Sequence, residues 1–152
     1  MLAVVRIRGS PGLRRDAKDT FRLLRLGAIN DCALLPETQN FKGMIEKVKD
    51  FVTYGEIDKK TLVEMLKKRL KLRSNQKVDE KTLKTVTGFN SYEELADMLH
   101  EGNIKLSNFK ELQPVFRLTP PSKGFKSIKE HYPKGDLGYR KNEINGLLER
   151  MI

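Results

Sequence analysis

The sequence predicts an α+β fold, and three observations lead to this prediction. Short runs rich in β-branched and aromatic residues alternate with longer segments whose apolar residues recur at helical spacing. The short runs at 3–8, 32–35 and 51–54 are bounded by Gly, Pro or Asn-Asp breaks, as strands usually are. The chain has 152 residues, 38% of them hydrophobic, which is enough for one core of modest size.

The first strand is expected over residues 3–8. Side chains alternate between the two faces of a strand, so Val5 and Ile7 are expected to face a core while Arg6 and Arg8 face outward. The break Ser10-Pro11-Gly12 then ends this strand.

A helix is expected next, on the apolar stripe Ala17, Phe21 and Leu24, and Gly27 is expected to end it. Its opposite face carries four cations: Arg15, Lys18, Arg22 and Arg25. A short apolar run at 32–35 predicts the second strand, and Phe41, Met44, Ile45 and Val48 predict the second helix.

The run 51–54 ends at Gly55 and predicts a third strand. Residues 1–56 therefore have the order β-α-β-α-β, which closes when both helices pack on one face of a three-stranded antiparallel sheet. This arrangement resembles a ferredoxin-like domain. We expect residues 1–56 to form that core and residues 57–152 to form a helical extension with a basic C-terminal arm.

Three helices are expected between residues 57 and 112. Asp58 and Asp79 are candidate N-caps of the first two. Ser91 and Glu94 form a capping-box pattern that opens the third, which Gly102 ends. The first of these helices finishes in a cationic cluster: Lys67, Lys68, Arg69, Lys71 and Arg73.

The C-terminal part begins with a short strand at 115–118, which flanking prolines confine to a sheet edge. Residues 119–138 are expected to have little regular structure. The terminal helix carries an apolar stripe that should dock it on the body: Ile144, Leu147, Leu148 and Met151.

The net charge of +10 points to nucleic acid or an anionic membrane surface as the partner. The charge is concentrated in three zones. Residues 1–25 hold seven Lys or Arg against two Asp, residues 59–84 hold ten against three acids, and residues 117–141 hold seven against two. Nucleic acid is the leading partner class, because the apolar stripes that a membrane would need are required for the core.

Two basic zones have the composition of an RNA-binding surface. Cations neutralise phosphates, Arg adds bidentate contacts, and exposed aromatic rings stack on unpaired bases. In each zone the alternative is a solvated face, with Asp19 pairing to Arg15 or Arg22 in the first. The candidate RNA-binding residues are Arg6, Arg8, Arg14, Arg15, Lys18, Arg22, Arg25, Lys123, Lys126, Tyr139, Arg140 and Lys141.

Motifs of enzymes are missing from the sequence. His100 and His131 lie apart from Cys32 and from any carboxylate at metal-ligand spacing, so no metal or other cofactor is expected. There is no Walker-type phosphate loop, no dinucleotide fingerprint and no nucleophile elbow. A lone cysteine allows no internal disulfide, and no apolar run has the ~20 residues that span a bilayer, so we expect a cytoplasmic protein.

Several segments resemble one ribosomal protein family. They are Val4-Val5-Arg6-Ile7-Arg8-Gly9, Leu23-Leu24-Arg25-Leu26 and Gly43-Met44-Ile45 near the start, and Gly135-Asp136 with Asn142-Glu143-Ile144-Asn145 near the end. With these segments taken together, the chain resembles large-subunit ribosomal protein number thirty in its longer archaeal form. The eukaryotic counterpart of that family is number seven.

The resemblance implies a structural, non-catalytic protein of the large ribosomal subunit that binds ribosomal RNA near the 5S RNA and contacts neighbouring ribosomal proteins. It implies no membrane and no small-molecule substrate as partners. Two alternatives stay open at the level of the sequence. One is a free-standing RNA-binding or chaperone protein, and the other is a metal-dependent RNA-processing enzyme.

Overall fold

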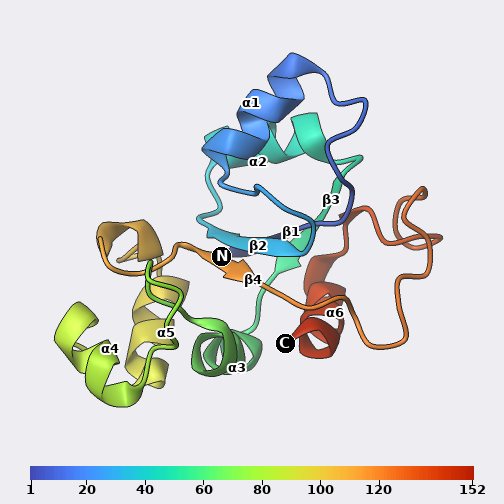
Figure 1. Cartoon of the computed structure of the whole chain (residues 1–152). Helices are drawn as coiled ribbons and strands as arrows, with labels where there is room; N and C mark the ends of the chain where they lie inside the picture. The colour runs from blue at the N-terminus through green and yellow to red at the C-terminus, as the bar shows by residue number, and fades with distance from the viewer.

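A five-stranded sheet with helices on both faces forms the centre of the computed structural model, which describes residues 1–152 (Figure 1). Its strands lie in the order β4-β2-β1-β3-β5. Their bounds are β1 Leu2–Arg6, β2 Asp31–Leu35, β3 Val52–Glu56, β4 Val115–Arg117 and β5 Gly138–Tyr139.

The α+β class and the β-α-β-α-β order of the first 56 residues are confirmed, with β1 antiparallel to both β2 and β3. The sheet has five strands and not the expected three. Strand β4 adds to β2 in antiparallel orientation, at the predicted edge position, and β5 adds to β3 in parallel. Both additions come from the C-terminal third of the chain, so no local pattern in residues 1–56 could reveal them.

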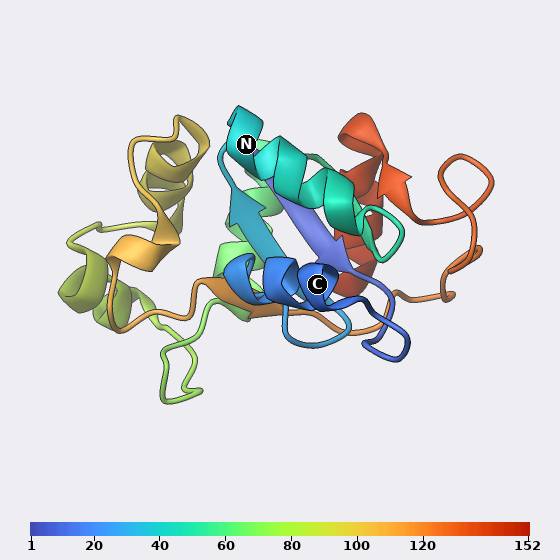
Figure 2. The ribbon, with the colours of Figure 1, turned by 90° about the horizontal axis from the view of Figure 1, so that it is seen from above.

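Helices α1 (Arg15–Leu23) and α2 (Gln39–Val48) cover one face of the sheet and lie side by side across it (Figure 2). Burial drives this packing, because apolar side chains of both helices and three strands form one core cluster. Its members include Leu2, Val4, Phe21, Leu24, Leu26, Ala33, Ile45, Val48 and Val52.

The second face of the sheet is covered by the helices that follow in the chain. These are α3 (Lys59–Arg69), α5 (Tyr92–His100) and α6 (Ile144–Met151), with α4 (Glu80–Thr87) beside them. Ala3, Val5 and Cys32 of the sheet belong to the same cluster of 22 buried residues as the apolar side chains of these helices. Residues 57–152 thus supply one wall of the core, and a domain boundary at residue 56 stays a prediction.

The helix ends agree only in part with the expected caps. Ser91 caps α5, with its Oγ accepting from the Glu94 N–H at 3.2 Å. The Glu94 carboxylate accepts from the N–H of Asn90 at 3.0 Å, and Asn90 lies one residue before the cap. Asp58 and Asp79 stand at the N-cap positions of α3 and α4, but neither carboxylate makes a capping hydrogen bond, so that part of the prediction was wrong.

The terminal helix docks on the body as expected, and polar contacts fix its position. The Asn145 side chain accepts from the Asp58 N–H at 2.9 Å and donates to the Glu56 carbonyl at 3.1 Å. At the other end of α6, the Arg69 guanidinium donates to the Ile152 carbonyl at 2.7 Å. These bonds join α6 to both ends of α3.

Replacing Gly55 with alanine is expected to loosen this docking. A Cβ at position 55 would overlap the Lys141 carbonyl oxygen and come within 3.0 Å of the Ile144 Cβ. Overpacking of this kind costs about 1 to 3 kcal/mol of unfolding free energy. Urea unfolding followed by circular dichroism measures the loss, and Gly43→Ala, on an open surface of α2, is the control. An equal effect of both substitutions would contradict this account of Gly55.

Candidate nucleic-acid interface

The first basic zone lies along α1 and is exposed to solvent. Arg14 stands at the N-cap of α1, Arg15, Lys18 and Arg22 lie on the helix, and Arg25 follows its end, all of them exposed. None belongs to an ion pair, so the expected alternative of Asp19 pairing with Arg15 or Arg22 does not occur. Unpaired exposed cations in a row leave their full charge available to phosphates.

Arg25 adopts a backbone conformation that normally belongs to glycine. Helix α1 ends at Leu23 and not near Leu26 as expected, because the Leu26 N–H bonds to the Phe21 carbonyl at 3.0 Å. This Schellman closure holds Arg25 in the left-handed region with φ of 60°. An arginine there has a conformational cost that glycine would not have.

Arg25→Gly is therefore expected to leave the unfolding free energy within about 1 kcal/mol of the wild type, since glycine suits this conformation. The same change should weaken RNA binding roughly tenfold, the effect of one lost charge-assisted contact. Filter binding to RNA and urea unfolding measure the two effects. Arg25→Lys, which keeps the charge, is the control. Unchanged binding in Arg25→Gly would assign the residue to the solvated face.

Arg6 does not face outward as the alternation rule predicts. It is 3% exposed, and its guanidinium lies 4.2 Å from the centre of the Phe21 ring. It donates to the carbonyls of Leu26 at 2.8 Å and Gly27 at 3.0 Å, and to the Ser10 hydroxyl at 2.8 Å. Burial lowers its pKa, and the nearby Asp31 carboxylate partly opposes that effect. Arg6 therefore ties the loop after α1 to the sheet.

Arg8 lies at the edge of this region and is half-buried. Its guanidinium stacks 5.0 Å from the centre of the Phe51 ring and donates to the Asp50 carbonyl at 3.2 Å. One face of the side chain is thus occupied by the protein, and its exposed part remains a candidate contact.

The basic arm is irregular in structure, as expected, but it is held to the body at Asp136. The Asp136 carboxylate accepts from the backbone N–H groups of Lys126 and Ser127 and pairs with Arg140. Asp136 and Arg140 are both buried, at 4% and 6% exposure, and Arg140 also stacks 5.2 Å from the centre of the Tyr132 ring. Arg140 is thus covered by the protein and paired with Asp136, so the expected contact with RNA stays a prediction that this burial does not favour.

The remaining candidate RNA-binding residues of the arm are open to solvent. Lys123 and Lys141 are exposed, both at positive φ, and Lys126 is exposed while donating to the Pro133 carbonyl at 3.1 Å. The ring of Tyr139 is 44% exposed and lies 5.3 Å from that of Tyr54. Its hydroxyl donates to Glu56, and this bond raises the pKa of Tyr139 to about 12, so the ring stays neutral and can stack on a base.

The central basic zone is partly neutralised within the protein. Lys59 pairs with Asp97 at 2.5 Å and Lys68 with Glu64 at 3.6 Å, while Arg69 is bound to the C-terminus. The exposed loop 119–138 and the α4–α5 segment also project from opposite ends of the sheet, with α1 between them (Figures 1 and 2). The three basic zones thus lie apart from one another on the molecule.

No three His, Cys, Asp or Glu side chains lie together in a way that could hold a metal ion. Cys32 is fully buried in the core, and burial raises the pKa of its thiol to about 12. None of the helices has the length and apolar character needed to cross a membrane.

Comparison with known proteins gives a consistent result. Residues 2–52 match the family described as ribosomal protein L30p/L7e. Over its whole length the chain is 50% identical to the large ribosomal subunit protein uL30 of Thermoplasma volcanium, of which it covers 93%. It is 45% identical to the uL30 proteins of Archaeoglobus fulgidus and Nanoarchaeum equitans, with at least 99% of each chain aligned. These relatives are archaeal, in agreement with the expected archaeal form.

Proposed function

Because the chain belongs to the ribosomal protein L30p/L7e family and is a structural constituent of the large ribosomal subunit, we propose that it binds ribosomal RNA through two separate cationic surfaces and holds the bound segments apart. The first surface is the α1 row, which comprises Arg14, Arg15, Lys18, Arg22 and Arg25. The second is the arm surface, which comprises Lys123, Lys126, Lys141 and Tyr139.

The observation that supports this proposal most strongly is the absence of ion pairs in the α1 row, although acidic residues stand within the same helix. A row of free cations binds phosphates and releases counterions, whereas a paired row would not. The rigid sheet between the two surfaces then sets the spacing of the bound RNA. The role is one of assembly and includes no catalytic step.

A position near the 5S RNA, contacts with neighbouring ribosomal proteins and a place in cytoplasmic ribosomes are further parts of the proposal. They rest on the resemblance of the chain to its family. Cross-linking within purified large subunits tests the first two, since it reports which RNA and which proteins lie beside each surface.

Sedimentation of cell extract through a high-salt gradient tests the proposal as a whole. We expect the protein to migrate with the large subunit at about one copy per particle, because its two surfaces bind the same particle together. A peak at the top of the gradient would contradict it and favour a free-standing RNA chaperone. RNA cleavage that stops when magnesium is chelated would instead favour a processing enzyme.

A further inference from the structure

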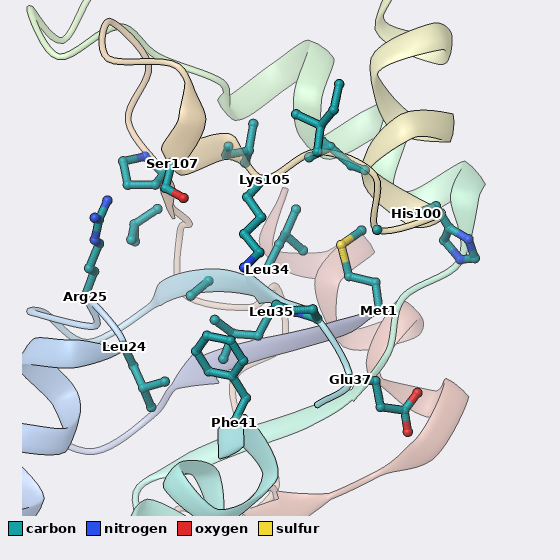
Figure 3. A pocket seen from close by; sticks show the side chains of 18 of the residues that line it. Met1, Leu24, Arg25, Leu34, Leu35, Glu37, Phe41, His100, Lys105 and Ser107 are labelled. Atoms are coloured by element: carbon teal, nitrogen blue, oxygen red, sulfur yellow. The ribbon is translucent and has the colours of Figure 1, made fainter. Parts of the chain in front are cut away.

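A groove with an apolar floor opens at the edge of the sheet, between residues of the first 41 positions and the segment 99–115. Strand β4 pairs with β2 only as far as Ala33, so Leu34 and Leu35 have no strand outside them. The floor contains these two leucines and Phe41 of α2, and the far wall is the segment from Leu99 to Ser107 (Figure 3). Its volume is about 490 Å³, within the usual range for small-ligand sites, which often lie at such junctions.

The charged side chains around the groove are two cations and two carboxylates. Glu37 pairs with Lys42 at 2.7 Å, whereas Glu101 accepts from the neutral Asn103 amide at 2.8 Å and belongs to no ion pair. Arg25 and Lys105 take part in no ion pair and reach the groove from opposite segments of the chain (Figure 3). The groove thus combines an apolar floor with two free cations at its rim.

Arg25 reaches the groove from a fixed backbone position. It holds its left-handed conformation, with φ of 60°, at the rim of this groove. The Schellman closure after α1 fixes this conformation, and with it the point from which the Arg25 side chain reaches the rim.

We propose that this groove receives one unpaired nucleotide of the ribosomal RNA, with the base on the floor beside Phe41 and the phosphate between Arg25 and Lys105. The proposal rests on the proposed function, in which RNA is the main partner. A nucleotide is the occupant whose chemistry fits, because it joins a flat, weakly polar ring to an anion, and the floor and the rim offer the matching surfaces.

Site-directed photocross-linking tests this occupant. Cys32 is the only cysteine and is fully buried, so Ser107→Cys adds a single accessible thiol at the groove for a benzophenone label. Asn108→Cys is the matched control, since Asn108 is exposed and adjacent but does not line the groove. Labelled proteins are incorporated into large subunits and irradiated, and the cross-linked nucleotide is mapped by reverse transcription.

We expect the label at position 107 to join one RNA nucleotide, and Arg25→Gly or Lys105→Ala in that background to lower the yield roughly tenfold. A cross-link to a neighbouring protein, or no cross-link, from protein that has entered the subunit would overturn the proposal while leaving the proposed function intact. Failure of the wild-type chain to enter subunits would instead count against the proposed function.

A second measurement covers the case in which the labelled variant fails to assemble. The wild-type chain is titrated with adenosine 5′-monophosphate at millimolar concentration and followed by NMR. Shifts at the Phe41 ring and at Leu34 would support the proposal. The same shifts with inorganic phosphate alone would reduce the site to a simple anion site and overturn it, as would the absence of any shift.

Discussion

Replacing Asp136 with alanine is expected to lower the unfolding free energy by about 3 to 5 kcal/mol, because it leaves the buried Arg140 charge without a partner. Both side chains are almost fully buried, and the carboxylate also accepts the N–H groups of Lys126 and Ser127. The substitution thus removes the contact that holds the basic arm to the body. Urea unfolding followed by circular dichroism measures the loss.

Two further variants make the test specific. Glu130→Ala, on an exposed residue of the same loop that makes no ion pair, is expected to change stability by no more than about 0.5 kcal/mol. The double variant Asp136→Leu with Arg140→Met removes both charges and should recover part of the loss, since an apolar pair is tolerated where a buried ion pair stood. The recovery is incomplete because the N–H groups of Lys126 and Ser127 still lose their acceptor. A single-variant loss below about 1 kcal/mol would show that the pair is effectively hydrated.

The same variant should also loosen the arm. Lys126, Lys129 and Lys134 lie in the loop that Asp136 organises, and each offers trypsin a cleavage site. We expect cleavage in this loop to be much faster in Asp136→Ala than in the wild type, because local opening controls proteolysis. Equal cleavage rates would mean that the loop is held by its other contacts, such as the bond between His131 and Asp50 at 2.9 Å.

Replacing Arg14 and Arg15 together with alanine is expected to weaken binding to large-subunit ribosomal RNA roughly 30-fold at about 0.15 M salt. Each phosphate contact contributes about 0.9 to the slope of log K against log salt, so the slope should fall by about 2 units. Both side chains are exposed and unpaired, so the unfolding free energy should change by less than about 0.5 kcal/mol. Binding measured at several salt concentrations gives the slope.

The matched control removes the same amount of charge from cations that are already paired. Lys59 binds Asp97 and Lys68 binds Glu64, so Lys59→Ala with Lys68→Ala changes the net charge equally. We expect a smaller change of slope in this variant, because paired cations have fewer counterions to release. Equal slopes for the two variants would show that total charge, and not the α1 row, governs binding.

The sequence determined the parts of this protein that depend on local periodicity. The β-α-β-α-β order follows from apolar spacings within about ten residues, such as Phe21 and Leu24 in α1. The exposure of the α1 cations follows from the same stripe, because residues opposite a buried helix face meet solvent. The sequence also concentrated the positive charge in particular segments, and this pointed to an RNA partner.

Tertiary structure decided which charged residues are free. The alternation in β1 predicts an exposed Arg6 only if one face of the sheet is exposed to solvent. Helix α1 and the loop after it cover that face and contact Arg6. Arg140 is covered for a similar reason, because it pairs with Asp136 inside the protein. Asp136 lies in a loop of irregular backbone, whose sequence has no periodic pattern from which this pair could be predicted. Availability of a side chain depends on what covers it, and that covering comes from elsewhere in the chain.

The outer strands and the groove both depend on contacts between distant segments of the chain. Strand β5 pairs with a strand more than eighty residues earlier. The groove exists because the pairing of β2 with β4 ends at Ala33, while the segment around Lys105 lies nearby. Local spacing sets which face of each element is apolar, so it can be read from the sequence. The closure of those faces depends on contacts between distant segments, and only the folded chain determines which cations remain exposed to RNA.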